Sequence, residues 1–124
     1  TGCGLAGHLF EMARASGVGV ALKLSAVPLL DGARETVTEG ILSSLHSHNE
    51  RLQRKIVNIE SVEKEPLYPV IFDPQTAGGL LASVPGEQSE LCLRELRTLG
   101  YQLATVVGNV QPCSEQEEQL WIEV

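Results

Sequence analysis

Apolar residues recur at helical spacing near the start of the chain. Between residues 5 and 16 they return every three or four positions, which places them on one face of a helix. Gly17 follows directly, and glycine commonly ends a helix because it adopts a left-handed backbone without strain. We therefore predict a helix from Leu5 to Ser16. Its apolar stripe consists of Leu5, Leu9, Met12, Ala13 and Ser16.

A two-residue alternation begins soon after this helix. Val20, Leu22 and Leu24 alternate with small or polar residues, which is the pattern of a half-buried strand. Short apolar or β-branched runs further along predict more strands, and the alternation returns at the end of the chain. These later strands are predicted at 56–59, 79–84, 103–110 and 120–124.

Two more helices are indicated by their boundary residues. Asp31 can cap a short helix that runs to about residue 38, and Pro85-Gly86 opens another over about residues 87–99. The polar stretch 41–54 is predicted to be a loop with one turn of helix. The resulting order, α-β-α-β-β-α-β-β, predicts an α+β fold in which helices pack on a mixed sheet. No interior boundary divides the chain, so residues 1–124 are expected to form a single domain.

Composition excludes several classes of protein. The 124-residue chain is 43% hydrophobic and carries a net charge of −7, so it is globular and poorly suited to a nucleic-acid groove. A phosphate site would have to act locally, through backbone N–H groups, a helix terminus or a divalent cation. Cys3, Cys92 and Cys113 are widely spaced thiols, as expected in the cytoplasm. The apolar runs are too short to cross a bilayer.

The most informative segment is Phe72–Leu81, which reads FDPQTAGGLL. Pro74 restricts Asp73 to an extended conformation, and Gln75 and Thr76 then offer amide and hydroxyl groups. Gly78 and Gly79 allow a ligand or another backbone to approach closely. A polar elbow of this kind often positions a binding site, although spacing alone favours a structural turn.

The opening residues also have the parts of an anion site. Thr1, Gly2 and Gly4 precede the first helix, whose N-terminal N–H groups carry partial positive charge. Most glycines before helices only make a turn, so this signal is weak alone. Cys3 is interpreted as a small buried hydrophobe rather than a nucleophile, because no histidine is placed to activate it.

Two histidines in the polar stretch 41–54 are candidate metal ligands. His46 and His48 would share one face if extended, but zinc needs three or four ligands and no third is nearby in sequence. No catalytic residue and no metal ligand are therefore assigned. The acidic cluster 115–118 is interpreted as a solvated loop.

Three stretches together resemble one family. FDPQTAGGLL is similar to the D-P-Q-T-[SA]-G-G-L-L signature of selenophosphate synthetase (selenide, water dikinase). TGCGLAGHL at the start resembles its D-V-T-G-F-G-L-x-G-H-L motif, with Cys3 where phenylalanine is usual. SSLHSHN at 43–49 resembles its S-S-x-H-x-x-N motif, which implies that His46 and Asn49 fix loops by hydrogen bonds to backbone.

The resemblance implies the C-terminal domain of that enzyme, with the mixed, largely antiparallel sheet of aminoimidazole ribonucleotide synthetase-like proteins. It implies ATP and Mg²⁺ as cofactors, selenide as substrate, a homodimer, and an N-terminal domain holding most nucleotide, metal and catalytic residues. Because the chain starts inside a motif, we expect a truncated fragment that is inactive alone. The residues expected to contact the nucleotide are Thr1, Gly2, Gly4, Asp73, Gln75, Thr76, Gly78 and Gly79.

Two alternatives remain open from the sequence. The chain could belong to another ATP-dependent synthetase or kinase of the same superfamily, against which the DPQT run counts. It could instead be a non-catalytic binding or oligomerisation module that kept the fold.

Overall fold

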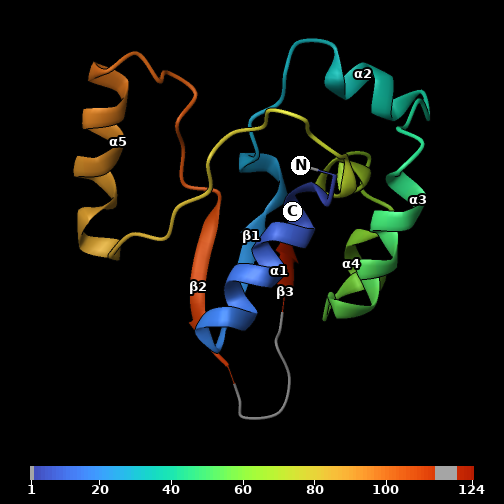
Figure 1. Ribbon diagram of the computed structural model, residues 1–124, viewed down its shortest axis with the longest axis horizontal. Helices are drawn as coiled ribbons and strands as arrows, with labels where there is room; N and C mark the ends of the chain where they lie inside the picture. The colour runs from blue at the N-terminus through green and yellow to red at the C-terminus, as the bar shows by residue number, and fades with distance from the viewer. Residues whose placement is uncertain (1, 114–119) are drawn as a thin grey trace.

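The computed structural model of the protein describes residues 2–113 and 120–124 (Figure 1). Within these described residues, the regular elements are five α-helices and three β-strands, joined by short 3₁₀ turns. The α-helices are α1 Gly4–Ser16, α2 Ala33–Thr38, α3 His46–Asn49, α4 Ile59–Val62 and α5 Ser89–Thr98; the strands are β1 Val18–Lys23, β2 Gly108–Pro112 and β3 Leu120–Glu123. The 3₁₀ turns are Leu24–Ala26, Glu50–Lys55, Tyr68–Phe72 and Gly86–Gln88.

The three strands form one mixed sheet with β1 in the centre. β1 pairs antiparallel with β2 and parallel with β3, in the order β2-β1-β3. Val20 of β1 lies opposite Val110 on one side and Leu120 on the other, which fixes the faces of all three strands. The mixed sheet and its packed helices confirm the predicted α+β class.

Helix α1 lies on the sheet and contributes Ala6, Leu9 and Ala13 to the core (Figure 1). It ends where the sequence predicts, because Gly17 adopts a φ of 63° and its N–H donates to the carbonyls of Ala13 and Arg14. The apolar face of α1 packs with residues of the sheet and of the Tyr68–Phe72 turn. The buried core comprises Ala6, Leu9, Ala13, Val20, Leu22, Leu24, Ile56, Val62, Tyr68, Ile71, Phe72, Leu120 and Ile122.

Helix α5 stands apart from this core. In Figure 1 it lies at the far side of the molecule, joined by two long connecting segments. None of its ten residues is buried. We call residues 79–107, which comprise α5 and these connections, the arm.

The prediction of a strand at 79–84 was wrong. An apolar run becomes a strand only when a neighbouring strand supplies backbone partners, and the segment instead leads from the Phe72 turn to α5 without strand pairing. The predicted strand at 103–110 begins later, at Gly108, with one preceding hydrogen bond from Lys23 N–H to the carbonyl of Val107.

The predicted strand at 56–59 was also wrong. Ile56 makes a single bridge to Leu120, and Ile59 already starts α4. The side chain of Asn58 makes the hydrogen bonds to β3 that a strand backbone would otherwise make. Its Nδ2 donates to the carbonyl of Ile122 at 2.7 Å, and its Oδ1 accepts from Ile122 N–H at 3.0 Å. The stretch 41–54 is more helical than predicted, with α3 followed by the Glu50–Lys55 turn.

Candidate functional site

The first glycine turn is anchored against the core. Gly4 is buried with a φ of 72°, and a Cβ at this position would lie 2.8 Å from the carbonyl carbon of Phe72. Only glycine fits, both for its backbone conformation and for this close approach. The start of α1 is therefore fixed directly to the segment that opens the DPQT run.

Asn49 joins the same two segments from a third part of the chain. Its side-chain Nδ2 donates to the carbonyl of Gly2 at 2.6 Å and to that of Phe72 at 2.9 Å. These partners are 47 and 23 residues away in sequence. Asn49 is itself buried; its bond to Phe72 is buried and its bond to Gly2 is partly buried, and together they hold the start of α1 beside the segment that opens the DPQT run. This confirms the expected role of Asn49 as a loop-fixing residue.

His46 supports this arrangement by packing. It is 5% exposed and meets the ring of Phe72 edge-on, with centroids 6.0 Å apart. Within residues 2–113 and 120–124, its Nδ1 has no hydrogen-bond partner, so the hydrogen bond to backbone expected of His46 is not made by this atom. His48 is exposed on the same short helix. Residues two apart on a helix point about 200° away from each other, so the two histidines do not share a face as they would if extended.

Tyr68 also packs against Phe72, with ring centroids 5.2 Å apart. Burial raises its pKa to about 12, and the charges of Glu50 and Glu63 add to the effect. Its hydroxyl also has no hydrogen-bond partner in the described part of the chain. Packing against Phe72, rather than polar pairing, therefore holds this side chain.

The two bends border one cleft at the surface, with a volume of about 420 Å³. This lies within the range of small-molecule sites, roughly 300–1,000 Å³. The cleft is lined by Gly2, Ser43, Leu45, Pro74 and Thr76. Residues from all three motifs thus meet in one place.

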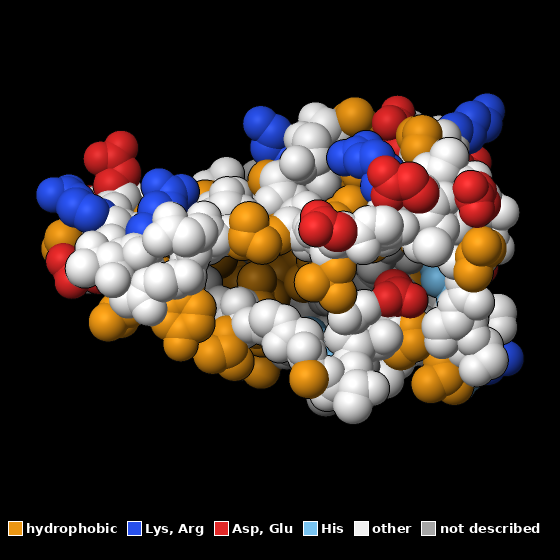
Figure 2. Space-filling model, turned by 90° about the horizontal axis from the view of Figure 1, so that it is seen from above, with side chains coloured by type: hydrophobic (Ala, Val, Ile, Leu, Met, Phe, Trp, Pro, Cys, Tyr) orange, Lys and Arg blue, Asp and Glu red, His pale blue; other side chains and the backbone are white. Residues whose placement is uncertain are grey.

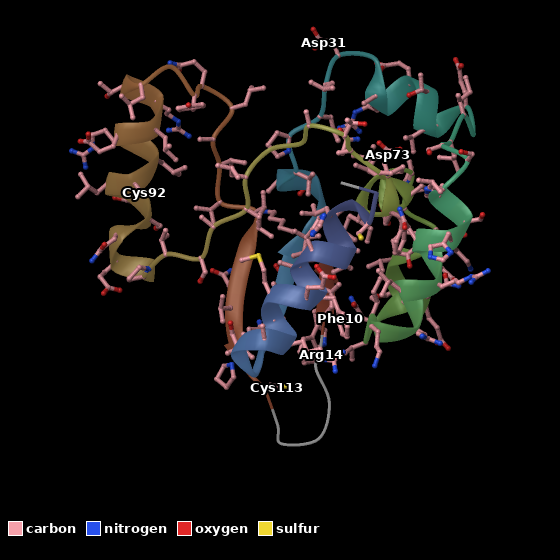
Figure 3. The ribbon with its side chains drawn as sticks, in the orientation of Figure 1. Phe10, Arg14, Asp31, Asp73, Cys92 and Cys113 are labelled. Carbon is pink, nitrogen blue, oxygen red and sulfur yellow. The ribbon has the colours of Figure 1, made fainter. Side chains whose placement is uncertain are left out.

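The predicted nucleotide contacts are distributed unevenly around this cleft. Gly2 and Thr76 line it, whereas Gly4 is buried behind it against Phe72. Asp73 is half-buried beside the Tyr68–Phe72 turn (Figure 3) and accepts a hydrogen bond from the side-chain amide of Gln75. Gly78 and Gly79 are exposed beyond it, and Thr1 lies outside the described residues. Ser43 and Leu45, which are not among the predicted nucleotide contacts, belong to the SSLHSHN motif and also line the cleft.

The side chains that line the cleft can form hydrogen bonds with a ligand, but none of them is an acid, a base or a strong nucleophile. The five residues that line it are uncharged, and the hydroxyls of Ser43 and Thr76 are its side-chain polar groups. The interpretation of Cys3 as buried was wrong: its side chain is exposed, because it occupies the N-cap at the surface end of α1. Among the described residues, no group of three His, Cys, Asp or Glu side chains could hold a metal ion.

A second hollow, of about 520 Å³, lies along α5. It is lined by Glu90, Arg94, Arg97 and Thr98, which all belong to one exposed helix. Since no second element contributes a convergent group, we regard the smaller cleft as the candidate site. None of the helices in the described residues is long and apolar enough to span a membrane.

Comparison with known proteins gives the family to which the chain belongs. Residues 1–120 match the family model "AIR synthase related protein, C-terminal domain". The match covers nearly the whole chain, and the chain therefore belongs to this family.

Individual relatives carry a more specific name. The chain is 37% identical over 122 residues to "Selenide, water dikinase" of Caldanaerobacter subterraneus subsp. tengcongensis, covering 98% of this chain and 35% of that protein. It is 34% identical over 116 residues to the protein of that name from Clostridioides difficile, covering 94% and 33%. For the Geobacter metallireducens protein the identity is 36% over 115 residues, covering 93% and 33%. The chain thus spans about a third of the length of these relatives.

Proposed function

We propose that this chain is the C-terminal domain of a selenophosphate synthetase. The complete enzyme would convert ATP, selenide and water to selenophosphate, AMP and phosphate. The names of the similar proteins and the three motifs support this assignment. The observation that carries it is the meeting of all three motifs around one cleft, tied together by Asn49.

The cleft is proposed to form one wall of the nucleotide site. Phosphoryl transfer depends mainly on positioning and on stabilising negative charge, so a wall of hydroxyl and backbone N–H donors is a useful contribution. Gly2 and Thr76 would lie nearest the nucleotide. Thr1, Asp73, Gln75, Gly78 and Gly79 are proposed as flanking contacts, and Gly4 as the residue that permits the geometry.

Magnesium does not fit this wall by itself. Mg²⁺ prefers carboxylate and phosphate oxygens, whereas no carboxylate lines the cleft in the described residues. Mg²⁺ would therefore be held by ATP and by polypeptide outside this chain. We also propose that this polypeptide is an N-terminal domain and that the complete enzyme is a cytoplasmic homodimer.

Turnover measurements test the proposal. The chain alone is expected to fold but to release no AMP from ATP, because it lacks charged groups at the cleft. The full-length protein should release AMP only when selenide is present. Selenide-independent turnover with another acceptor would instead indicate a different synthetase of the same superfamily. Selenide-dependent turnover by the chain alone would refute the proposal that catalysis needs polypeptide outside this chain.

A further inference from the structure

Two hydroxyl groups lie at the cleft, and they come from distant parts of the chain. One belongs to Thr76 of the DPQT run and the other to Ser43 of the SSLHSHN motif. Ser43 is half-buried and lines the cleft, whereas its neighbour Ser44 is exposed and does not line it. Of these two adjacent serines, only Ser43 can therefore contact a ligand in the cleft.

The hydroxyl of Ser43 is oriented by a local turn. Its Oγ accepts a hydrogen bond from Leu45 N–H at 3.3 Å, and its carbonyl accepts one from His46 N–H at 3.0 Å. One lone pair of the Oγ is thus in use, and the hydroxyl proton remains to be donated. Within residues 2–113 and 120–124, Ser43 Oγ donates to no acceptor. The turn therefore leaves the Ser43 hydroxyl as a donor for a group bound in the cleft.

The same turn is held in a fixed place beside the other two motifs. It leads directly into α3, where His46 packs edge-on against the ring of Phe72. Three residues later, Asn49 bonds the carbonyls of Gly2 and Phe72. A donor that is fixed before its ligand arrives loses little conformational freedom on binding, so its hydrogen bond contributes more to affinity.

Hydrogen-bond acceptors on this side of the cleft are already used by the protein. The carbonyl of Gly2 accepts from Asn49, and the carbonyls of Ser43 and Leu45 accept from backbone N–H groups of α3. What this side offers to a ligand through its side chains is the Ser43 donor. Ionised phosphate oxygens accept hydrogen bonds and donate none, so a phosphate group matches this arrangement.

Positive charge does not assist binding at this cleft. No Lys or Arg among the described residues lines it. Seen from above, the Lys and Arg side chains lie at the α5 end and along the upper and right-hand sides of the view, away from its hollowed centre (Figure 2). The net charge of −7 gives no general attraction for an anion either. A phosphate at this wall would depend on a few neutral donors, so the loss of one donor should have a large effect.

We infer that Ser43 is a phosphate-contacting residue of the nucleotide site, and that its hydroxyl donates to an oxygen of the triphosphate, as that of Thr76 does. The inference rests on the proposed function, which places the nucleotide at this cleft. A hydrogen bond to a charged group corresponds to about a 10- to 100-fold change in affinity.

Calorimetric titration of Mg²⁺–ATP into the full-length protein tests the contact. Ser43→Ala should weaken binding about 10- to 100-fold. Ser43→Cys keeps the shape of the side chain but donates only weakly, so it should show a similar loss. Ser44→Ala is the matched control and should bind like the parent. Urea denaturation checks that all three variants fold. Equal affinities of the Ser43→Ala and Ser44→Ala proteins would overturn the inference.

Competition by Mg²⁺–tripolyphosphate identifies the part of the nucleotide that is contacted. Ser43→Ala should weaken tripolyphosphate by the same factor as ATP. A loss with ATP alone would assign the hydroxyl to the nucleoside and would also overturn the inference.

Selenide-dependent release of AMP, measured on the same proteins, separates this inference from the proposed function. A parent that binds ATP but releases no AMP with selenide would refute the proposed function and leave the phosphate contact standing. An active parent whose Ser43→Ala variant binds ATP normally would refute only the contact.

Discussion

The side-chain Nδ2 of Asn49 donates a hydrogen bond to the carbonyl oxygen of Phe72 at a distance of 2.9 Å. The same nitrogen donates to the carbonyl of Gly2 at 2.6 Å. One amide group thus satisfies carbonyls from two distant segments, each of which leads into a glycine-containing bend. The cleft between these bends depends on a residue that does not line it.

Replacing Asn49 with alanine should lower the free energy of unfolding by about 2–4 kcal/mol. The substitution removes the donor from the buried carbonyl of Phe72 and from the partly buried carbonyl of Gly2. Each such loss costs about 1–3 kcal/mol. Urea denaturation measures the change. Asn109→Ala, at an exposed position on β2, is the control and should change the free energy by less than about 0.5 kcal/mol. Equal effects of the two substitutions would contradict the role of Asn49.

Gly4→Ala should be more destabilising than Gly17→Ala. Both glycines have positive φ, at 72° and 63°, so both substitutions carry the backbone cost of about 1 kcal/mol. Only at Gly4 would the new Cβ overlap another segment, the backbone of Phe72, which adds about 1–3 kcal/mol. Thermal or urea unfolding of the two variants isolates this contact. If both lose the same stability, the close approach of Gly4 and Phe72 does not exist in solution.

Tyr68 should make the protein sensitive to high pH. Its pKa is about 12 in the folded protein against an ordinary value of 10.0, so the unfolded chain ionises first. The contribution of neutral Tyr68 to the free energy of unfolding is fully present below about pH 10. It is lost as the pH rises toward 12, with a loss of about 1 kcal/mol at pH 11.

Tyr68→Phe should remove this part of the alkaline loss and change stability little at pH 7, because the hydroxyl has no hydrogen-bond partner within the described residues. Tyr101→Phe, at an exposed position, should keep the loss. Urea denaturation between pH 8 and pH 11 measures both. A parallel decline in all three proteins would count against a buried Tyr68.

Asn58→Ala should loosen the attachment of β3 to α4. Both of its hydrogen bonds to the backbone of Ile122 would be lost, at a cost of about 1–3 kcal/mol. Amide hydrogen exchange should accelerate at Ile122 more than at Val20 on the central strand. Unchanged protection at Ile122 would mean that the side chain does not serve as a strand partner.

The local sequence pattern was sufficient to predict those elements whose ends are marked by a residue in the sequence. The helix from residue 5 to 16 and the strand after it follow from apolar spacing and from the left-handed residue Gly17. The segments 56–59 and 79–84 have equally strand-like composition, but a strand also needs a partner. Asn58 bonds β3 through its side chain in the first case, and the second leads into the arm.

Each motif of the site could be found from the sequence, but the contacts that join the motifs in the fold could not. The family resemblance indicated that Asn49 bonds backbone, and the structure confirms it. Which carbonyls it reaches depends on packing across 47 and 23 residues, which no local pattern records. Free cysteine usually behaves as a small buried hydrophobe, which predicts a buried Cys3, yet Cys3 is exposed at the N-cap of α1.

Calorimetric titration of Mg²⁺–ATP into the full-length enzyme tests most directly whether the cleft contacts the nucleotide. Thr76→Val removes a hydroxyl from the cleft and should weaken binding about 10- to 100-fold, as expected for one hydrogen bond to a charged group. Thr105→Val, at an exposed position in the arm, should bind like the parent. Unchanged affinity in the folded Thr76→Val enzyme would contradict the proposed nucleotide wall.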